Sequence, residues 1–181
     1  MIQPSMAHVR STYKYLAVIL IGLFIFLLDY YELANPVTDE FLLFILSIAK
    51  SAYFIYFVFK TIKDTAHKEF YFHEFMSFAV ISILLVIISF AIDYYCLFRI
   101  SSVSFAGTIP KSNIATEFIS FFYYSISVFT TAGFGDIKPN STSAQVFVSM
   151  ELMTAFFFTV LIIANIGHIR SSFVKKNKVH D

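Results

Sequence analysis

The sequence predicts an all-α transmembrane fold with four membrane-spanning helices and one short re-entrant helix between the third and fourth spans. The first observation is composition: 58% of the 181 residues are hydrophobic and 14% are charged, whereas a soluble domain carries about 25% charged residues. The second is that the apolar residues form long runs, at 15–28, 41–59, 75–98 and 144–169. A helix needs roughly 20 apolar residues to cross the ~30 Å hydrocarbon core, so each run predicts a span. The first and shortest run continues through Tyr30 and Tyr31, which favour the headgroup layer.

The distribution of charge orients the predicted spans. Basic residues precede the first run, separate the second run from the third and follow the fourth: Arg10, Lys14, Lys60, Lys63, Lys68, Arg170, Lys175, Lys176 and Lys178. Because positive charge collects on the cytoplasmic side, we expect an integral protein of the plasma membrane with both termini cytoplasmic and residues 99–143 outside. A signal peptide is the alternative for the first run, but no small-residue cleavage site follows it.

The outward segment contains the least regular part of the chain. It begins with a polar stretch, 101–113, in which Gly107 breaks any helix. An aromatic run follows at 118–129, too short to cross the membrane and therefore typical of a re-entrant helix. We expect Thr116 and Glu117 to cap and charge-complement the start of this helix. Irregular backbone at membrane depth survives only beside protein or a water-filled cavity, so a half-helix followed by such backbone indicates a pore.

The motif that follows the aromatic run reads Thr130-Thr131-Ala132-Gly133-Phe134-Gly135-Asp136. It resembles the signature of the tetrameric potassium channels, in which Thr, Val or Ile, Gly, Tyr or Phe, and Gly occur in order, commonly followed by Asp. The layout is similar as well: an outer helix, a pore helix, a filter and an inner helix. The resemblance divides the chain into a two-span region at 1–72, a pore module at 73–170 and a short basic cytoplasmic tail at 171–181.

The resemblance implies that K⁺ binds backbone carbonyls of Thr131, Ala132, Gly133 and Phe134, with Gly135 completing the filter. Carbonyl oxygens replace the hydration shell of the ion, and the Thr131 hydroxyl adds an oxygen at the innermost position. Successive carbonyls of an ordinary strand alternate in direction. Turning them all to one axis requires positive φ, which we expect at the two glycines. One chain supplies too few oxygens to ring an ion, so the mechanism predicts a homotetramer.

Residues around the motif are expected to support the filter, together with Thr130. By the resemblance, Phe134 points away from the ions and packs against the pore helices, and the hydroxyl of Tyr124 is a candidate partner of Asp136. Ser127 stands where some relatives carry a buried Glu. Ala132 departs from the usual Val or Ile, which reduces packing behind the filter and favours weaker selectivity.

Two charged residues inside the predicted spans, Glu151 and Lys50, need an account. An acid within the membrane usually faces protein or water, so Glu151 is expected to brace the pore helix through Ser127 or Tyr124, or to satisfy an ordinary helix contact. Lys50 lies near the middle of the second span, and Asp93 is its best partner by depth, ahead of Asp29. This pair is structural or, as the alternative, senses voltage or a ligand.

The inner end of the fourth span carries the residues expected near a gate. Asn165 is a candidate for lining it, and Gly167 is the glycine at which this helix is expected to flex or to end.

The sequence therefore predicts a potassium-selective channel subunit that conducts K⁺ passively. A weakly selective cation channel, a potassium-transporter subunit and a non-conducting regulatory subunit are the alternatives. No catalytic carboxylate pair, zinc-ligand spacing, nucleophile triad or phosphate-binding loop is visible, so neither an enzyme nor a cofactor is expected beyond potassium ions in the filter. The expected partners are further copies of the chain and the lipid bilayer, with no nucleic acid or small-molecule substrate.

Overall fold

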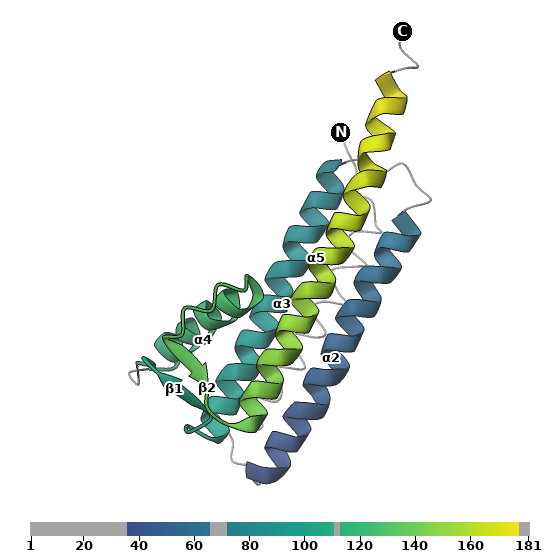
Figure 1. Cartoon of the computed structure of the whole chain (residues 1–181). Coiled ribbons are helices and arrows are strands. Elements are labelled where there is room, and N and C mark those ends of the chain that lie inside the picture. Colours follow the sequence, from purple (N-terminus) through teal and green to yellow (C-terminus); the bar gives the residue numbers. More distant parts are fainter. Residues whose placement is uncertain (1–35, 66–71, 111–112, 178–181) are drawn as a thin grey trace.

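The computed structural model describes residues 36–65, 72–110 and 113–177, and the predicted span at 15–28 lies outside them. The described residues form three long helices that run side by side and a shorter helix that lies with a two-stranded ribbon beside one end of the bundle (Figure 1). In chain order the elements are α2 (Pro36–Thr65), α3 (Phe72–Ile100), β1 (Phe105–Gly107), α4 (Ile114–Phe129), β2 (Ile137–Pro139) and α5 (Thr142–Asn177).

Two of these helices are long and apolar enough to cross a membrane. The apolar stretches are Ala79–Ile100 in α3 and Thr142–Ala164 in α5, of 22 and 23 residues. At about 1.5 Å per residue each exceeds 30 Å, the thickness of the hydrocarbon core. In α2 the apolar stretch among the described residues, Phe41–Tyr56, is shorter. The third and fourth predicted spans thus match membrane-length helices, and α2 as a span stays a prediction.

Aromatic side chains fix α4 against α3. The ring of Phe105 on β1 lies 5.1 Å from that of Phe121 on α4 and 5.6 Å from that of Tyr94 on α3, measured between centroids. Phe98 of α3 also packs on Phe121, at 5.2 Å. These rings are buried, and edge-to-face pairs of this kind stabilise beyond their buried area. The aromatic run that predicted a re-entrant helix therefore forms the contact that places this helix.

The predicted start of the re-entrant helix was wrong by three residues. Helix α4 begins at Ile114, and Asn113, not Thr116, is its cap: the Asn113 side chain accepts a hydrogen bond from the Thr116 backbone N–H at 2.8 Å. Asn113 has the extended backbone, with φ −157°, that a capping residue needs. Glu117 lies in the first turn, where its charge complements the helix dipole as expected.

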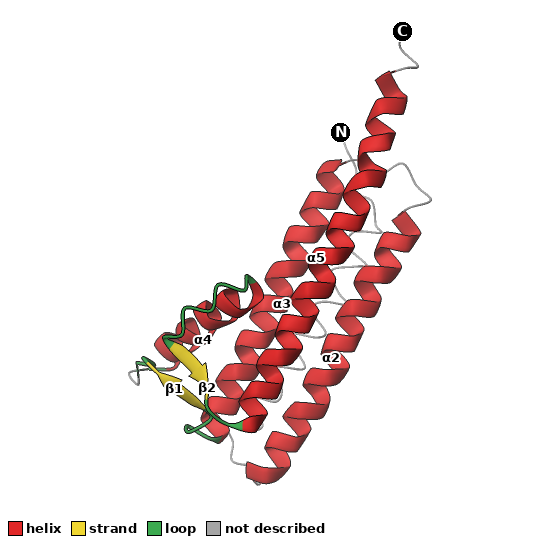
Figure 2. Cartoon of the chain, viewed as in Figure 1, coloured by secondary structure: helices red, strands yellow, loops and turns green. Residues whose placement is uncertain are grey.

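A short antiparallel ribbon, absent from the all-α prediction, closes the outward segment (Figure 2). In its register Phe105 faces Pro139 and Gly107 faces Ile137. The backbone N–H of Thr108 also donates to the carbonyl of Asp136 at 3.1 Å. The ribbon ties the chain that leaves the predicted filter to the chain that leaves α3.

Helix α5 is longer than predicted. It continues through Asn177, past residue 170, where the pore module was expected to end. Its C-terminal part lies at the end of the bundle opposite α4 and the ribbon (Figure 1). The C-terminal part of α5 contains basic residues. These residues and the predicted filter therefore lie at opposite ends of the helical bundle.

Candidate functional site

The filter loop, residues 130–136, is hydrogen-bonded to the last turn of α4. Thr130 is the C-cap of the helix, and its N–H donates to the carbonyl of Ile126. The N–H groups of Ala132 and Gly133 both donate to the Ser127 carbonyl, at 2.9 and 3.3 Å. Ser127 thus contacts the predicted filter through its backbone, and the loop starts from a fixed point on the helix.

The sign of φ alternates along the filter loop. Thr131, Gly133 and Gly135 have positive φ, at 58°, 55° and 77°, whereas Ala132 and Phe134 between them do not. Both glycines therefore adopt the conformation that was predicted for them. Thr131 was not predicted to do so, and positive φ in a β-branched residue is strained. Its hydroxyl donates to the Thr130 carbonyl at 2.7 Å, which leaves the hydroxyl lone pairs available to a cation.

Helix α4 supplies a fixed partial charge beside the loop. It has 16 residues, an acidic residue in its first turn and no basic residue in its last. The C-terminal end of such a helix carries about half an elementary negative charge. This charge lies where the filter loop begins, so it favours a cation there.

Tyr123, not Tyr124, faces the filter loop. The Tyr123 ring stacks on Phe134 with centroids 6.1 Å apart and planes 7° from parallel. Partial burial and then the nearby Asp136 carboxylate raise the pKa of its hydroxyl. Tyr124 is 5% exposed and packs on Tyr94 and Phe105. One residue turns a helix by about 100°, so adjacent tyrosines point to different neighbours. In the part of the chain that the structure describes, no hydrogen bond joins Tyr124 to Asp136, so the predicted contact is not formed.

Glu151 braces the pore helix, but through residues other than those predicted. Its side chain is fully buried in α5. The hydroxyl of Ser125 on α4 lies 2.6 Å from one carboxyl oxygen, and the hydroxyl of Tyr94 on α3 donates to the other. Ser127 and Tyr124, the expected contacts, are replaced by Ser125 and Tyr94. The carboxyl therefore joins three helices at one point.

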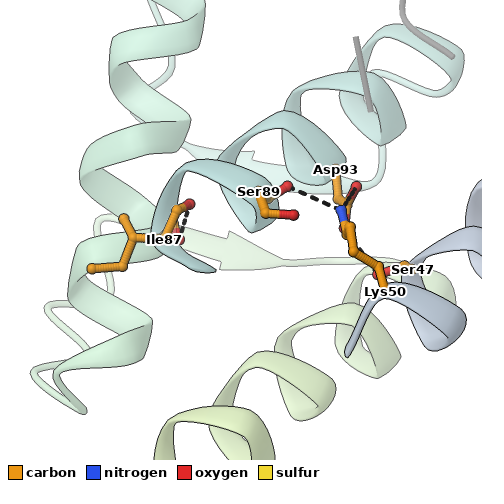
Figure 3. Close-up of polar contacts among 6 residues, drawn as sticks. Ser47, Lys50, Ile87, Ser89 and Asp93 are labelled. Carbon is orange, nitrogen blue, oxygen red and sulfur yellow. Dashed lines mark hydrogen bonds and ion pairs between the residues drawn. The ribbon is translucent and has the colours of Figure 1, made fainter. Parts of the chain in front are cut away.

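Lys50 pairs with Asp93 between α2 and α3. Its ammonium lies 2.6 and 2.7 Å from the two carboxylate oxygens and donates to the Ser89 carbonyl at 3.3 Å (Figure 3). The hydroxyl of Ser47 donates to the same carboxylate at 2.9 Å. Both charged side chains are more than nine-tenths buried. This is the pairing that depth in the membrane predicted. It joins α2 to α3, while the ring of Phe44 packs on that of Phe147 and joins α2 to α5.

The two candidate gate residues, Asn165 and Gly167, lie in α5. Their side-chain contacts lie outside the part of the chain that the structure describes. Sequence reasoning also passed over three residues of the site: Tyr94, Tyr123 and Ser125. Tyr94 and Ser125 carry hydroxyls within otherwise apolar runs, which was the available signal. No sequence signal distinguished Tyr123 from Tyr124.

A family model described as an ion channel matches residues 81–171. The matched segment runs from α3 through the ribbon, α4 and the filter loop into α5, and it covers half of the chain. No curated protein and no solved structure matches the chain. Since the match covers half of the chain, the chain belongs to the ion channel family.

Proposed function

We propose that this ion channel subunit is selective for potassium and conducts K⁺ passively as a homotetramer. The observation that carries the proposal is the alternation of φ at Thr131, Gly133 and Gly135, within a Thr-Ala-Gly-Phe-Gly motif directly after α4. Alternation of this kind allows successive carbonyls to turn toward one side of the loop. A file of carbonyls around an axis is what replaces the water around a dehydrated potassium ion.

Surfaces left open within one chain support a tetramer. Phe134 is 68% exposed although one face of its ring is covered by Tyr123. Helix α5 also exposes a broad apolar face, formed by Leu152, Met153, Phe156, Phe157, Val160 and Ile163. Neighbouring copies and lipid would cover these side chains. Four filter loops around one axis would supply the oxygens that one chain lacks.

A weakly selective cation channel is the second candidate. The observation in its favour is Ala132, whose small side chain is exposed within the chain and gives the filter loop less to pack against than Val or Ile. The α4 dipole attracts any cation and so does not separate the two candidates. The transporter alternative is weaker, since such systems typically join four related loops in one chain and this sequence has one.

Replacing Gly133 by alanine is expected to abolish K⁺ flux. A Cβ built on Gly133 has no atom of the chain within 4 Å, so the substitution causes no steric clash within one subunit. Its cost arises from φ +55°, at about 1–2 kcal/mol per subunit. We expect the variant to assemble but to lose gradient-driven K⁺ uptake in proteoliposomes. Ser149→Ala is the control, because Ser149 is exposed on α5 and its hydroxyl bonds within its own helix.

Mixing the two kinds of subunit tests the tetramer. If one Gly133→Ala subunit inactivates a channel of four, equal amounts of wild-type and variant chain leave about one sixteenth of the channels fully wild type. The flux should fall in that proportion after co-reconstitution from co-expressed chains. A fall to about one half would show that the subunits conduct independently and would reject the four-fold pore.

A further inference from the structure

Glu151 is buried at the meeting point of three helices with hydroxyl groups as its partners. It extends from α5 to Ser125 on α4 and Tyr94 on α3. The same Ser125 hydroxyl lies 2.9 Å from the Ile87 carbonyl of α3. The group therefore links the helix that carries the filter loop to both helices of membrane length.

The hydrogens of this cluster can be counted. Ser125 has one hydroxyl hydrogen but two acceptors within reach, the Ile87 carbonyl and a Glu151 oxygen. Tyr94 uses its hydrogen on the other Glu151 oxygen. If Glu151 itself carries a proton, it donates to Ser125, Ser125 donates to Ile87, and every short contact joins a donor to an acceptor. If Glu151 is ionised, one of the two Ser125 contacts lacks a hydrogen.

Among the described residues, the cation that acts on Glu151 is Lys50, and it is already paired with Asp93. Lys50 has three N–H donors, and all three are directed at the Asp93 oxygens and the Ser89 carbonyl. The other titratable groups that face Glu151 are Tyr94 and Asp93 from α3 and Tyr124 from α4, and none of them offers a positive charge. Burying an unpaired carboxylate costs so much that such a group takes up a proton instead.

We propose that Glu151 is protonated at neutral pH and positions α4 by donating a hydrogen bond to Ser125. Ser125 lies two residues before Ser127, whose carbonyl holds the N–H groups of Ala132 and Gly133. Fixing Ser125 thus fixes the point from which the filter loop starts. Loss of the proton at high pH places a negative charge there and forces Ser125 to turn from Ile87 to the carboxylate. The effect on current rests on the proposed function, whereas the protonation does not.

Infrared spectroscopy of the full chain in lipid tests the protonation without any current. The wild-type spectrum minus that of Glu151→Gln should contain the C=O stretching band of a protonated carboxylic acid at about pH 7. Glutamine is the matched variant, since its amide donates to Ser125 and accepts from Tyr94 as the neutral acid does. Tyr94→Phe should keep the acid band and move it to higher frequency, because the carbonyl oxygen loses a hydrogen bond. Carboxylate bands in place of the acid band, in the wild type and in Tyr94→Phe alike, would overturn the proposal.

Current recorded across planar bilayers tests the positioning role. Wild-type K⁺ current is expected to fall about three-fold or more over the alkaline pH interval in which the infrared acid band disappears. Glu151→Gln should conduct at about pH 7 like the wild type and stay constant across the same interval. A Glu151→Gln current that retains the full pH dependence would refute positioning by the proton. A persistent acid band without any wild-type current would instead leave the protonation established and reject the proposed conduction.

Discussion

Replacing Lys50 by methionine is expected to lower the free energy of unfolding of the full chain by about 3–5 kcal/mol. The substitution removes the positive partner and leaves Asp93 with a side chain that is 2% exposed. Asp93 then keeps the bond from Ser47 but loses both contacts to the Lys50 ammonium. Asp93 then either stays ionised without a cation or takes up a proton, and both outcomes remove the ion pair that joins α2 to α3.

Chemical unfolding in detergent micelles measures this loss, and a double variant identifies its cause. Lys50→Met combined with Asp93→Leu replaces the ion pair by apolar groups and is expected to recover most of the stability. Lys60→Met is the control, because Lys60 lies on the same helix and is exposed. If the double variant is as unstable as Lys50→Met alone, the packing of the lysine stem, and not the pair, holds α2 in place.

Replacing Gly107 by alanine is expected to break the ribbon beside the filter loop. Gly107 has φ +127°, a conformation that side chains rarely adopt, and a Cβ built there overlaps the Asp136 carbonyl. That carbonyl accepts the Thr108 N–H, so no small shift relieves the overlap without breaking a ribbon hydrogen bond. Strand β2 must then move away from β1 and take the end of the filter loop with it.

Amide hydrogen exchange followed by mass spectrometry measures the protection of the backbone N–H groups of the ribbon. Peptides that cover β1 and β2 should lose their protection in Gly107→Ala, while α3 keeps its own. K⁺ flux should fall together with the protection, because Asp136 is the last residue of the loop. Ala106→Ser is the control on the same strand, at an exposed position with ordinary backbone. Unchanged exchange in Gly107→Ala would mean that the ribbon does not hold the loop.

The sequence predicted those features that follow from a single strong physical requirement. A lysine in the middle of an apolar run needs an acid at similar depth, and Asp93 meets that need. Two glycines in a motif that must turn its carbonyls one way need positive φ, and both have it. In each case one chemical requirement determines the outcome without knowledge of how the helices pack.

The errors arose where two neighbours share the same chemistry. Tyr123 and Tyr124 differ only in helix register, and so do Ser125 and Ser127, so the contacts to Asp136 and Glu151 were assigned to the wrong member of each pair. Each residue turns a helix by about 100°. Which of two nearby residues faces a given partner is therefore known only when the position of the neighbouring helix is known. The strands of the ribbon have three residues each, which is too short for an alternating pattern to be visible.

The measurement that tests the central claim most directly is the reversal potential of the purified chain in a planar bilayer with K⁺ on one side and Na⁺ on the other. The proposed filter predicts a reversal near the potassium equilibrium potential, which would also show that Ala132 is compatible with selectivity. A robust current that reverses near zero would contradict selective binding by the carbonyls of the filter loop and would identify the protein as a cation channel of low selectivity.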